Sequence, residues 1–118
     1  MTNVLDKIIE DKKDFLKSIK KTNSLDSIEN TIKSLNNFLN FKEVIAKNKR
    51  ASLITEIKKA SPSAGELVRD FNHLNIAKMY VDNGAACLSV LTEEKHFLGK
   101  LDYIRDIKNK FKIPVLAK

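Results

Sequence analysis

The sequence predicts an α/β fold in which a helical N-terminal segment precedes a parallel β-sheet covered by helices. Apolar residues recur only at helical spacing from residue 1 to about residue 50. From Ala51 onward, continuous apolar runs alternate with amphipathic stretches in the order β-α-β-α-β. Each strand-plus-helix unit takes about 30 residues, as expected for a parallel crossover. We therefore divide the chain into a helical extension, 1–50, and an α/β segment, 51–118.

The helical extension is predicted to contain three helices. A stripe of apolar residues at helical spacing covers residues 4–19, and residues of the cap-forming type interrupt it at 22–24. A second helix is predicted over 25–35, and a third, short helix over 41–47. No strand pattern occurs in this segment.

The α/β segment is predicted to contain three strands, at about 52–58, 86–92 and 113–118. Amphipathic helices are expected between them, over 73–84 and 100–111. An open doubly wound sheet and part of a (β/α)8 barrel both fit this order. No G-x-G-x-x-G follows the first strand and no G-x-x-x-x-G-K-[ST] occurs, which argues against a dinucleotide-binding or P-loop protein.

The composition restricts the partners that we expect. The net charge is +7, and the densest basic stretch, residues 12–21, has lysines on the solvent side of an amphipathic helix. No zinc-finger pattern or stacking-aromatic pattern accompanies the charge, so nucleic acid and a membrane surface are not the expected partners. No apolar run reaches the roughly 18 to 20 residues that span a bilayer, and we expect a cytoplasmic location.

Three single residues have simple structural interpretations. Cys87 is the only cysteine, which excludes an internal disulfide and argues against a metal cluster, and we expect it to serve packing. His73 opens a predicted helix and is expected at its surface or as its cap. His96 is expected in an exposed loop.

Charged side chains occur at the ends of two predicted strands. Glu56 and Lys58 are two residues apart, so they share one face of the first strand, and Lys118 closes the third strand. An ion pair at a solvated strand end would explain them without function. In a (β/α)8 barrel, however, catalytic groups lie at the C-terminal ends of the strands. Their position therefore favours a functional site.

Three motifs resemble the indole-3-glycerol phosphate synthase family of tryptophan biosynthesis. That family carries E-x-K-x-x-S-P-S after strand one, L-S-V-L-T-E-x-x-x-F at strand two and I-P-V-L-x-K at strand three. The matching residues here are Glu56 to Ser63, Leu88 to Phe97 and Ile113 to Lys118. Two small departures are His96, where a tyrosine is usual, and Ala64.

The resemblance implies a (β/α)8 barrel enzyme, a carbon–carbon lyase without metal or other cofactor. Its substrate would be 1-(o-carboxyphenylamino)-1-deoxyribulose 5-phosphate, which is closed, decarboxylated and dehydrated to indole-3-glycerol phosphate. Lys118 would be the general acid for ring closure. Lys58 would bind anionic groups and assist as a second acid, and Glu56 would orient or deprotonate groups around them.

The resemblance also implies residues that bind substrate. Ser61 and Ser63 would hydrogen-bond its phosphate or carboxylate, although they could instead only cap the following turn. Phe97 would form an apolar wall for the aromatic ring, or could be ordinary core.

The length is shorter than the roughly 250 residues of a barrel, so the chain resembles the N-terminal portion of that enzyme. We expect no synthase activity from these residues alone, and an open sheet edge would allow self-association. Two alternatives stay open. One is another phosphate-substrate barrel, an isomerase or an aldolase with Lys118 as its Schiff base. The other is a basic, non-enzymatic fragment that binds nucleic acid.

Overall fold

The structure is a computed structural model and describes residues 3–48 and 50–118. Its contacts divide the chain into two compact units, Met1–Phe38 and Leu39–Lys118. The boundary between these units lies before the third helix, whereas the sequence pattern predicts a boundary at residue 50. The reason is that α3 (Phe41–Ala46) lies against the central strand β4 (Cys87–Val90) and so belongs to the sheet unit. None of the helices in the described part of the chain is long and apolar enough to cross a membrane.

The first unit consists of α1 (Val4–Thr22) and α2 (Leu25–Ser34), close to the predicted ranges. Asn3 and Asp6 form a capping box at the start of α1, and the Ser24 hydroxyl accepts the N–H of Ser27 at the start of α2. Both helices are amphipathic, but no side chain within them is buried. Most of their apolar residues are exposed.

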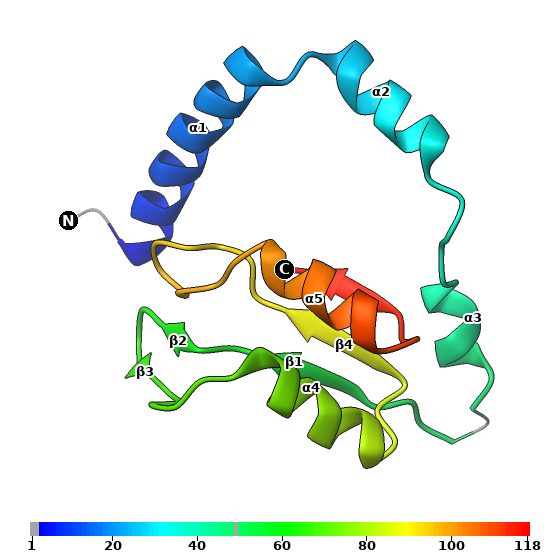
Figure 1. The fold of residues 1–118 in the computed structure, drawn as a ribbon. Coiled ribbons are helices and arrows are strands. Elements are labelled where there is room, and N and C mark those ends of the chain that lie inside the picture. The colour runs from blue at the N-terminus through cyan, green and yellow to red at the C-terminus, as the bar shows by residue number, and fades with distance from the viewer. Residues whose placement is uncertain (1–2, 49) are drawn as a thin grey trace. The chain divides into compact units, whose positions relative to one another are not determined.

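The second unit is built on a three-stranded parallel sheet of order β1-β4-β5 (Figure 1). Its strands are β1 (Ile54–Ile57), β4 (Cys87–Val90) and β5 (Val115–Ala117). Each lies inside its predicted range but is shorter at both ends. The prediction of a parallel α/β segment is confirmed.

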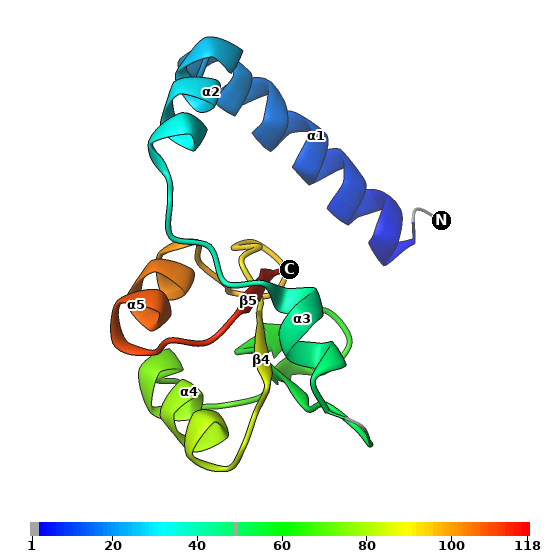
Figure 2. The same ribbon diagram turned by 90° about the vertical axis from the view of Figure 1, so that its right-hand side faces the viewer.

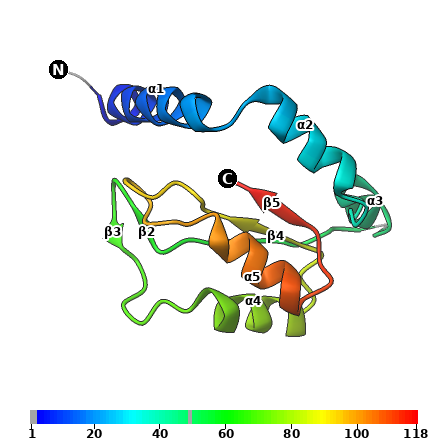
Figure 3. The same cartoon turned by 45° about the horizontal axis from the view of Figure 1, so that its top comes forward.

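Two helices cross between the strands, α4 (His73–Asp82) and α5 (Asp102–Lys110). Both lie on one side of the sheet, as Figure 3 shows, and Figure 2 shows α3 on the other side of β4. The Asn72 side chain caps α4 by accepting the N–H groups of Leu74 and Asn75. The crossovers after β1 and β4 thus each place a helix on the same face, which is the arrangement of the first units of a (β/α)8 barrel.

The core lies between the sheet and the pair α4 and α5. Side chains from both strands and helices form it and are at most 6% exposed; they are Ile57, Ala77, Leu88, Val90, Ile107 and Ile113. Because side chains alternate along a strand, Cys87 and Ser89 belong to the opposite face of β4 and are also buried. The expectation that Cys87 packs in the interior is confirmed, and burial raises the pKa of its thiol.

One short hairpin was not predicted. The Pro/Ser/Gly segment after β1 forms two antiparallel pieces of two residues each, β2 (Ala60–Ser61) and β3 (Gly65–Glu66). Gly65 has a φ of 68°, a conformation that glycine adopts without the cost of a Cβ. Figure 1 shows this hairpin at the end of the sheet toward which β1 and β4 run.

Candidate active site

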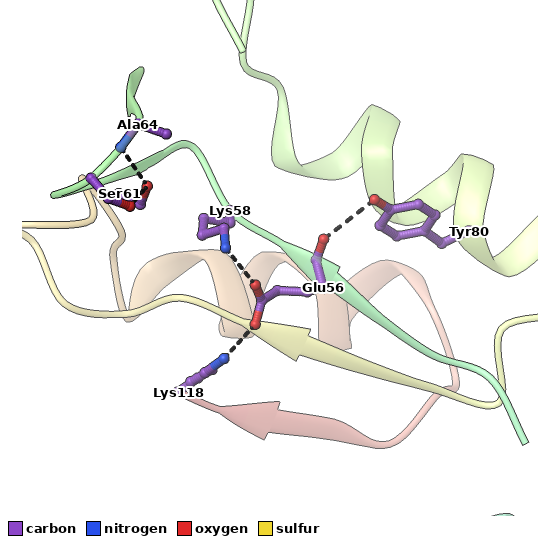
Figure 4. Close-up of polar contacts among 7 residues, drawn as sticks. Glu56, Lys58, Ser61, Ala64, Tyr80 and Lys118 are labelled. Carbon is purple, nitrogen blue, oxygen red and sulfur yellow. Dashed lines mark hydrogen bonds and ion pairs between the residues drawn. The ribbon is translucent and has the colours of Figure 1, made fainter. Parts of the chain in front are cut away.

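A carboxylate and two lysines meet at the C-terminal ends of the strands. Glu56 lies in β1, Lys58 follows that strand, and Lys118 follows β5. The Nζ atom of Lys118 lies 2.7 Å from Glu56 Oε2, and the Nζ atom of Lys58 lies 3.0 Å from Glu56 Oε1 (Figure 4). Each carboxylate oxygen therefore has its own ammonium partner.

The alternation of side chains explains why these three groups share a face. Ile57 is buried in the core beneath the helices, so its neighbours Glu56 and Lys58 point to the other side of the sheet. The register pairs Glu56 with Ser89 of β4, and Ser89 with Leu116 of β5. Lys118, two residues beyond Leu116, returns to the same face.

The cluster is partly solvated. The side chains of Glu56 and Lys58 are 30% and 33% exposed, and that of Lys118 is 57% exposed. The hydrogen bond from Lys118 is the main cause that lowers the pKa of Glu56, burial opposes it, and Lys58 lowers that pKa further. Glu56 is therefore held as a carboxylate.

Backbone contacts fix the two strand ends that carry the cluster. The Tyr80 hydroxyl of α4 donates to the carbonyl oxygen of Glu56 at 3.3 Å. Thr92 donates twice to the carbonyl oxygen of Lys118, from its N–H at 2.8 Å and from its hydroxyl at 2.9 Å. Neither Tyr80 nor Thr92 was predicted from the sequence to have this role. A tyrosine on a core-facing helix and a threonine near the end of a strand are too common to serve as signals.

The two predicted serines lie in the hairpin after β1. The Ser61 hydroxyl accepts the N–H of Ala64 at 3.2 Å and lies 3.5 Å from the Ser63 hydroxyl. Ser61 is half-buried and Ser63 is exposed. Ser61 thus stabilises the turn, which was the alternative considered from the sequence, and a role of either serine in substrate binding stays a prediction.

Phe97 lies half-buried in the loop between β4 and α5. Its N–H group donates to the carboxylate of Glu93 at 3.0 Å. Its predicted contact with a substrate ring stays a prediction. The role of Glu93 in this loop was missed, although a carboxylate at the start of a turn is a recognisable signal.

The two histidines, His73 and His96, are less exposed than the sequence predicted. Asn72, not His73, caps α4, and the His73 ring is 18% exposed. Its Nε2 lies 2.9 Å from Oδ2 of Asp106, and its ring stacks on Tyr103 with centroids 4.4 Å apart, so it links α4 to α5. His96 is half-buried rather than exposed, and its N–H donates to Glu93.

Among residues 3–48 and 50–118, no group of three or more His, Cys, Asp or Glu side chains could hold a metal ion. The cluster at the strand ends offers two ammonium groups and one carboxylate. This set can bind an anion and can transfer protons.

Comparison with known proteins identifies the family to which the chain belongs. The model of the indole-3-glycerol phosphate synthase family matches residues 5–118. The chain belongs to this family. The (β/α)8 barrel fold predicted from the sequence is confirmed for the family, and the parallel sheet observed here is a part of that fold.

Several curated relatives carry the family's name. Indole-3-glycerol phosphate synthase of Clostridium acetobutylicum is 45% identical over 116 residues, covering 98% of this chain and 44% of the relative. The enzyme of Desulforamulus reducens is 41% identical over 115 residues, covering 98% of this chain and 43% of the relative. That of Chlorobium chlorochromatii is 42% identical, covering 97% and 45%. The chain thus spans less than half the length of these relatives.

Proposed function

We propose that this chain supplies the first strands and part of the active site of an indole-3-glycerol phosphate synthase. The main observation in support is that Glu56 forms ion pairs with Lys58 and Lys118 at the C-terminal ends of parallel strands. The reaction closes the ring of 1-(o-carboxyphenylamino)-1-deoxyribulose 5-phosphate and releases CO2 and water. This makes the whole enzyme a carboxy-lyase that acts on a small phosphorylated substrate, and the cytoplasm is its proposed location.

Each group has a proposed role. Lys118 donates a proton to the ribulose carbonyl oxygen as the new carbon–carbon bond forms. Lys58 binds an anionic group of the substrate and assists as a second acid in the loss of water. Glu56 holds both ammonium groups in place, which suits it to orienting them. Ser61 and Ser63 bind the phosphate or carboxylate, and Phe97 lies against the aromatic ring.

The ion pair favours this reaction over an aldolase. A Schiff base requires a free amine as nucleophile, whereas an ammonium paired with a carboxylate is the form that donates a proton. Lys118 has such a partner at 2.7 Å. Borohydride trapping with a carbonyl substrate would label Lys118 only if the aldolase alternative held.

The experiment requires the rest of the barrel. We define the joined enzyme as residues 1–118 fused to the portion of the Clostridium acetobutylicum relative that follows its matched region. We expect indole-3-glycerol phosphate to accumulate, detected by indole fluorescence, with the joined enzyme and not with the 118-residue chain alone. A folded joined enzyme without turnover would contradict the proposed function, and turnover by the chain alone would contradict the requirement for further strands.

A further inference from the structure

The loop between β4 and α5, residues 91–101, is organised by one carboxylate. Oε2 of Glu93 accepts the N–H groups of His96 at 2.7 Å and Phe97 at 3.0 Å. Oε1 of Glu93 accepts the N–H of Lys95 at 3.1 Å. Three consecutive backbone donors thus converge on one side chain.

The main chain of the same residue closes the other half of the loop. The carbonyl oxygen of Glu93 accepts the N–H of Gly99 at 2.8 Å. Gly99 lies so close to the end of β4 that a Cβ atom there would collide with the carbonyl group of Leu91. The loop is therefore folded back on the strand, and Phe97 lies within the part that Glu93 encloses.

This loop is connected to the strand-end cluster through the backbone. Thr92 directly precedes Glu93 and donates both of its hydrogen bonds to the carbonyl oxygen of Lys118. One continuous series of hydrogen bonds and peptide bonds thus runs from Phe97 through Glu93 and Thr92 to Lys118. This series restrains the Phe97 backbone relative to the Lys118 backbone.

We propose that Glu93 is a positioning residue for Phe97. Its carboxylate fixes the loop so that the Phe97 ring is held at a set place relative to the ammonium of Lys118. In the whole enzyme, Glu93 would therefore hold the Phe97 ring where it binds the aromatic ring of the substrate, both before and during proton transfer from Lys118. This inference rests on the proposed function, and Glu93 itself does not contact the reacting atoms.

A carboxylate suits this position better than its amide analogue. Its two oxygens offer about four acceptor sites, which is enough for three N–H donors. A glutamine has one acceptor oxygen, and its NH2 group would face a backbone donor. The variants Glu93→Gln and Glu93→Ala should therefore loosen the loop progressively in that order, because hydrogen bonds to a charged group are stronger than those to a neutral one.

The first test needs only the 118-residue chain. Amide hydrogen exchange is measured by NMR at Lys95, His96 and Phe97, with the amide of buried Ile107 as an internal reference. We expect Glu93→Ala to accelerate exchange of the three loop amides at least tenfold and to leave Ile107 unchanged. The control is Glu94→Ala, which changes the exposed carboxylate next in sequence. Unchanged rates at the three amides in Glu93→Ala would overturn the proposal.

The second test measures the kinetic consequence in the joined enzyme. We expect Glu93→Ala to raise KM about tenfold with kcat within about threefold, and Glu93→Gln to lie between it and the wild type. Phe97→Ala should raise KM similarly, and adding Glu93→Ala to it should raise KM no further, because both changes remove one effect. If the rise in KM of the double variant equals the product of the rises in the two single variants, the proposal is overturned.

The two tests separate this inference from the proposed function. A wild-type joined enzyme that folds without turnover contradicts the synthase proposal, while the exchange measurement still decides whether Glu93 fixes the loop. If the wild-type joined enzyme turns over but Glu93→Ala leaves the exchange of the loop amides unchanged, only the proposed role of Glu93 is contradicted.

Discussion

Glu56 and Lys118 form an ion pair at 2.7 Å although the strand β4 lies between the strands that carry them. Neighbouring strands are about 4.8 Å apart, so the two side chains have to bridge about 10 Å. The residue beneath this bridge is Ser89, which is paired with Glu56 in the sheet register and is 6% exposed. Because its side chain is small, we expect Ser89 to leave the space in which the carboxylate and the ammonium meet.

The space above Ser89 leads to the first prediction. A valine at this position should keep the strand, which favours β-branched residues, but should separate Glu56 from Lys118. We expect Ser89→Val to lower kcat of the joined enzyme by at least about tenfold, because Lys118, the proposed proton donor, is no longer held in place. Ser89→Ala leaves the space open and should retain activity within about threefold of the wild type. Equal losses in both variants would contradict the explanation.

A second prediction concerns Lys118 as the proton donor. Lys118→Met in the joined enzyme should lower kcat by about 100-fold or more, since general acid catalysis contributes about that factor. KM should change far less, because the proton is transferred only in the transition state. Steady-state kinetics with the exposed Lys112→Met as the matched control checks this prediction. An unchanged kcat in Lys118→Met would contradict the assignment.

A third prediction concerns the acid titration of Glu56. Its pKa is lowered from the ordinary value of 4.5, mainly by the hydrogen bond from Lys118. A carbon-13 NMR titration of the Glu56 carboxyl should therefore give a midpoint below 4.5, and Lys118→Met should move that midpoint upward. A midpoint at or above 4.5 in the wild-type chain would refute it.

The same shift determines how Glu56 affects stability. Because the carboxyl ionises more readily in the folded chain than in the unfolded chain, its ionised form stabilises the fold. This contribution is fully present above about pH 4.5 and is lost as the pH falls through the lower pKa of the folded state.

The fourth prediction compares two threonines. The hydroxyl oxygen of Thr55 is buried and has no hydrogen-bond partner among the described residues. We expect Thr55→Val to raise the free energy of unfolding by about 1 kcal/mol, because an unsatisfied polar atom is removed at nearly constant shape. Thr92→Val removes the hydroxyl's hydrogen bond to the Lys118 carbonyl, although the N–H bond remains, and should lower the free energy of unfolding by about 1 kcal/mol. Urea denaturation measures both, and the same sign for the two variants would contradict this account.

The fifth prediction compares two glycines. Gly84 has a φ of 87° and open space where an added methyl group would lie, whereas Gly99 would place that group against the backbone of Leu91. Gly84→Ala should therefore cost about 1 kcal/mol through backbone strain alone. Gly99→Ala should cost about 2 to 3 kcal/mol and speed up exchange in the β4–α5 loop, because backbone must move. A smaller loss in Gly99→Ala than in Gly84→Ala, by urea denaturation, would contradict this reasoning.

Much of the fold follows from periodicity in the sequence. The alternation in residues 52–58 placed Glu56 and Lys58 on one face, and the structure brings both into one ion-pair cluster. The helices lie close to their expected positions because their apolar residues recur at a period of 3.6 over several turns. The parallel strands do so because each lies in a continuous apolar run.

The features that were missed depend on contacts, not on periodicity. The hairpin β2–β3 has two residues in each strand, which is too short for alternation to be visible. The bond from Tyr80 to the Glu56 carbonyl and the pairing of His73 with Asp106 join residues 24 and 33 positions apart. Such contacts exist only after α4 has packed against the sheet and α5.

The pairing of one carboxylate with two lysines leaves a formal charge of +1 at the strand ends, and both ammonium groups remain partly exposed. The field of that charge extends about one Debye length into solution, roughly 8 Å at physiological ionic strength. A phosphorylated, carboxylated substrate would therefore be attracted before it makes any contact, and dissolved salt would weaken this attraction. Under the proposed function, the shared carboxylate would act at two separate stages. It would limit the attraction of an approaching anion, and it would then hold Lys118 in place as the proposed proton donor.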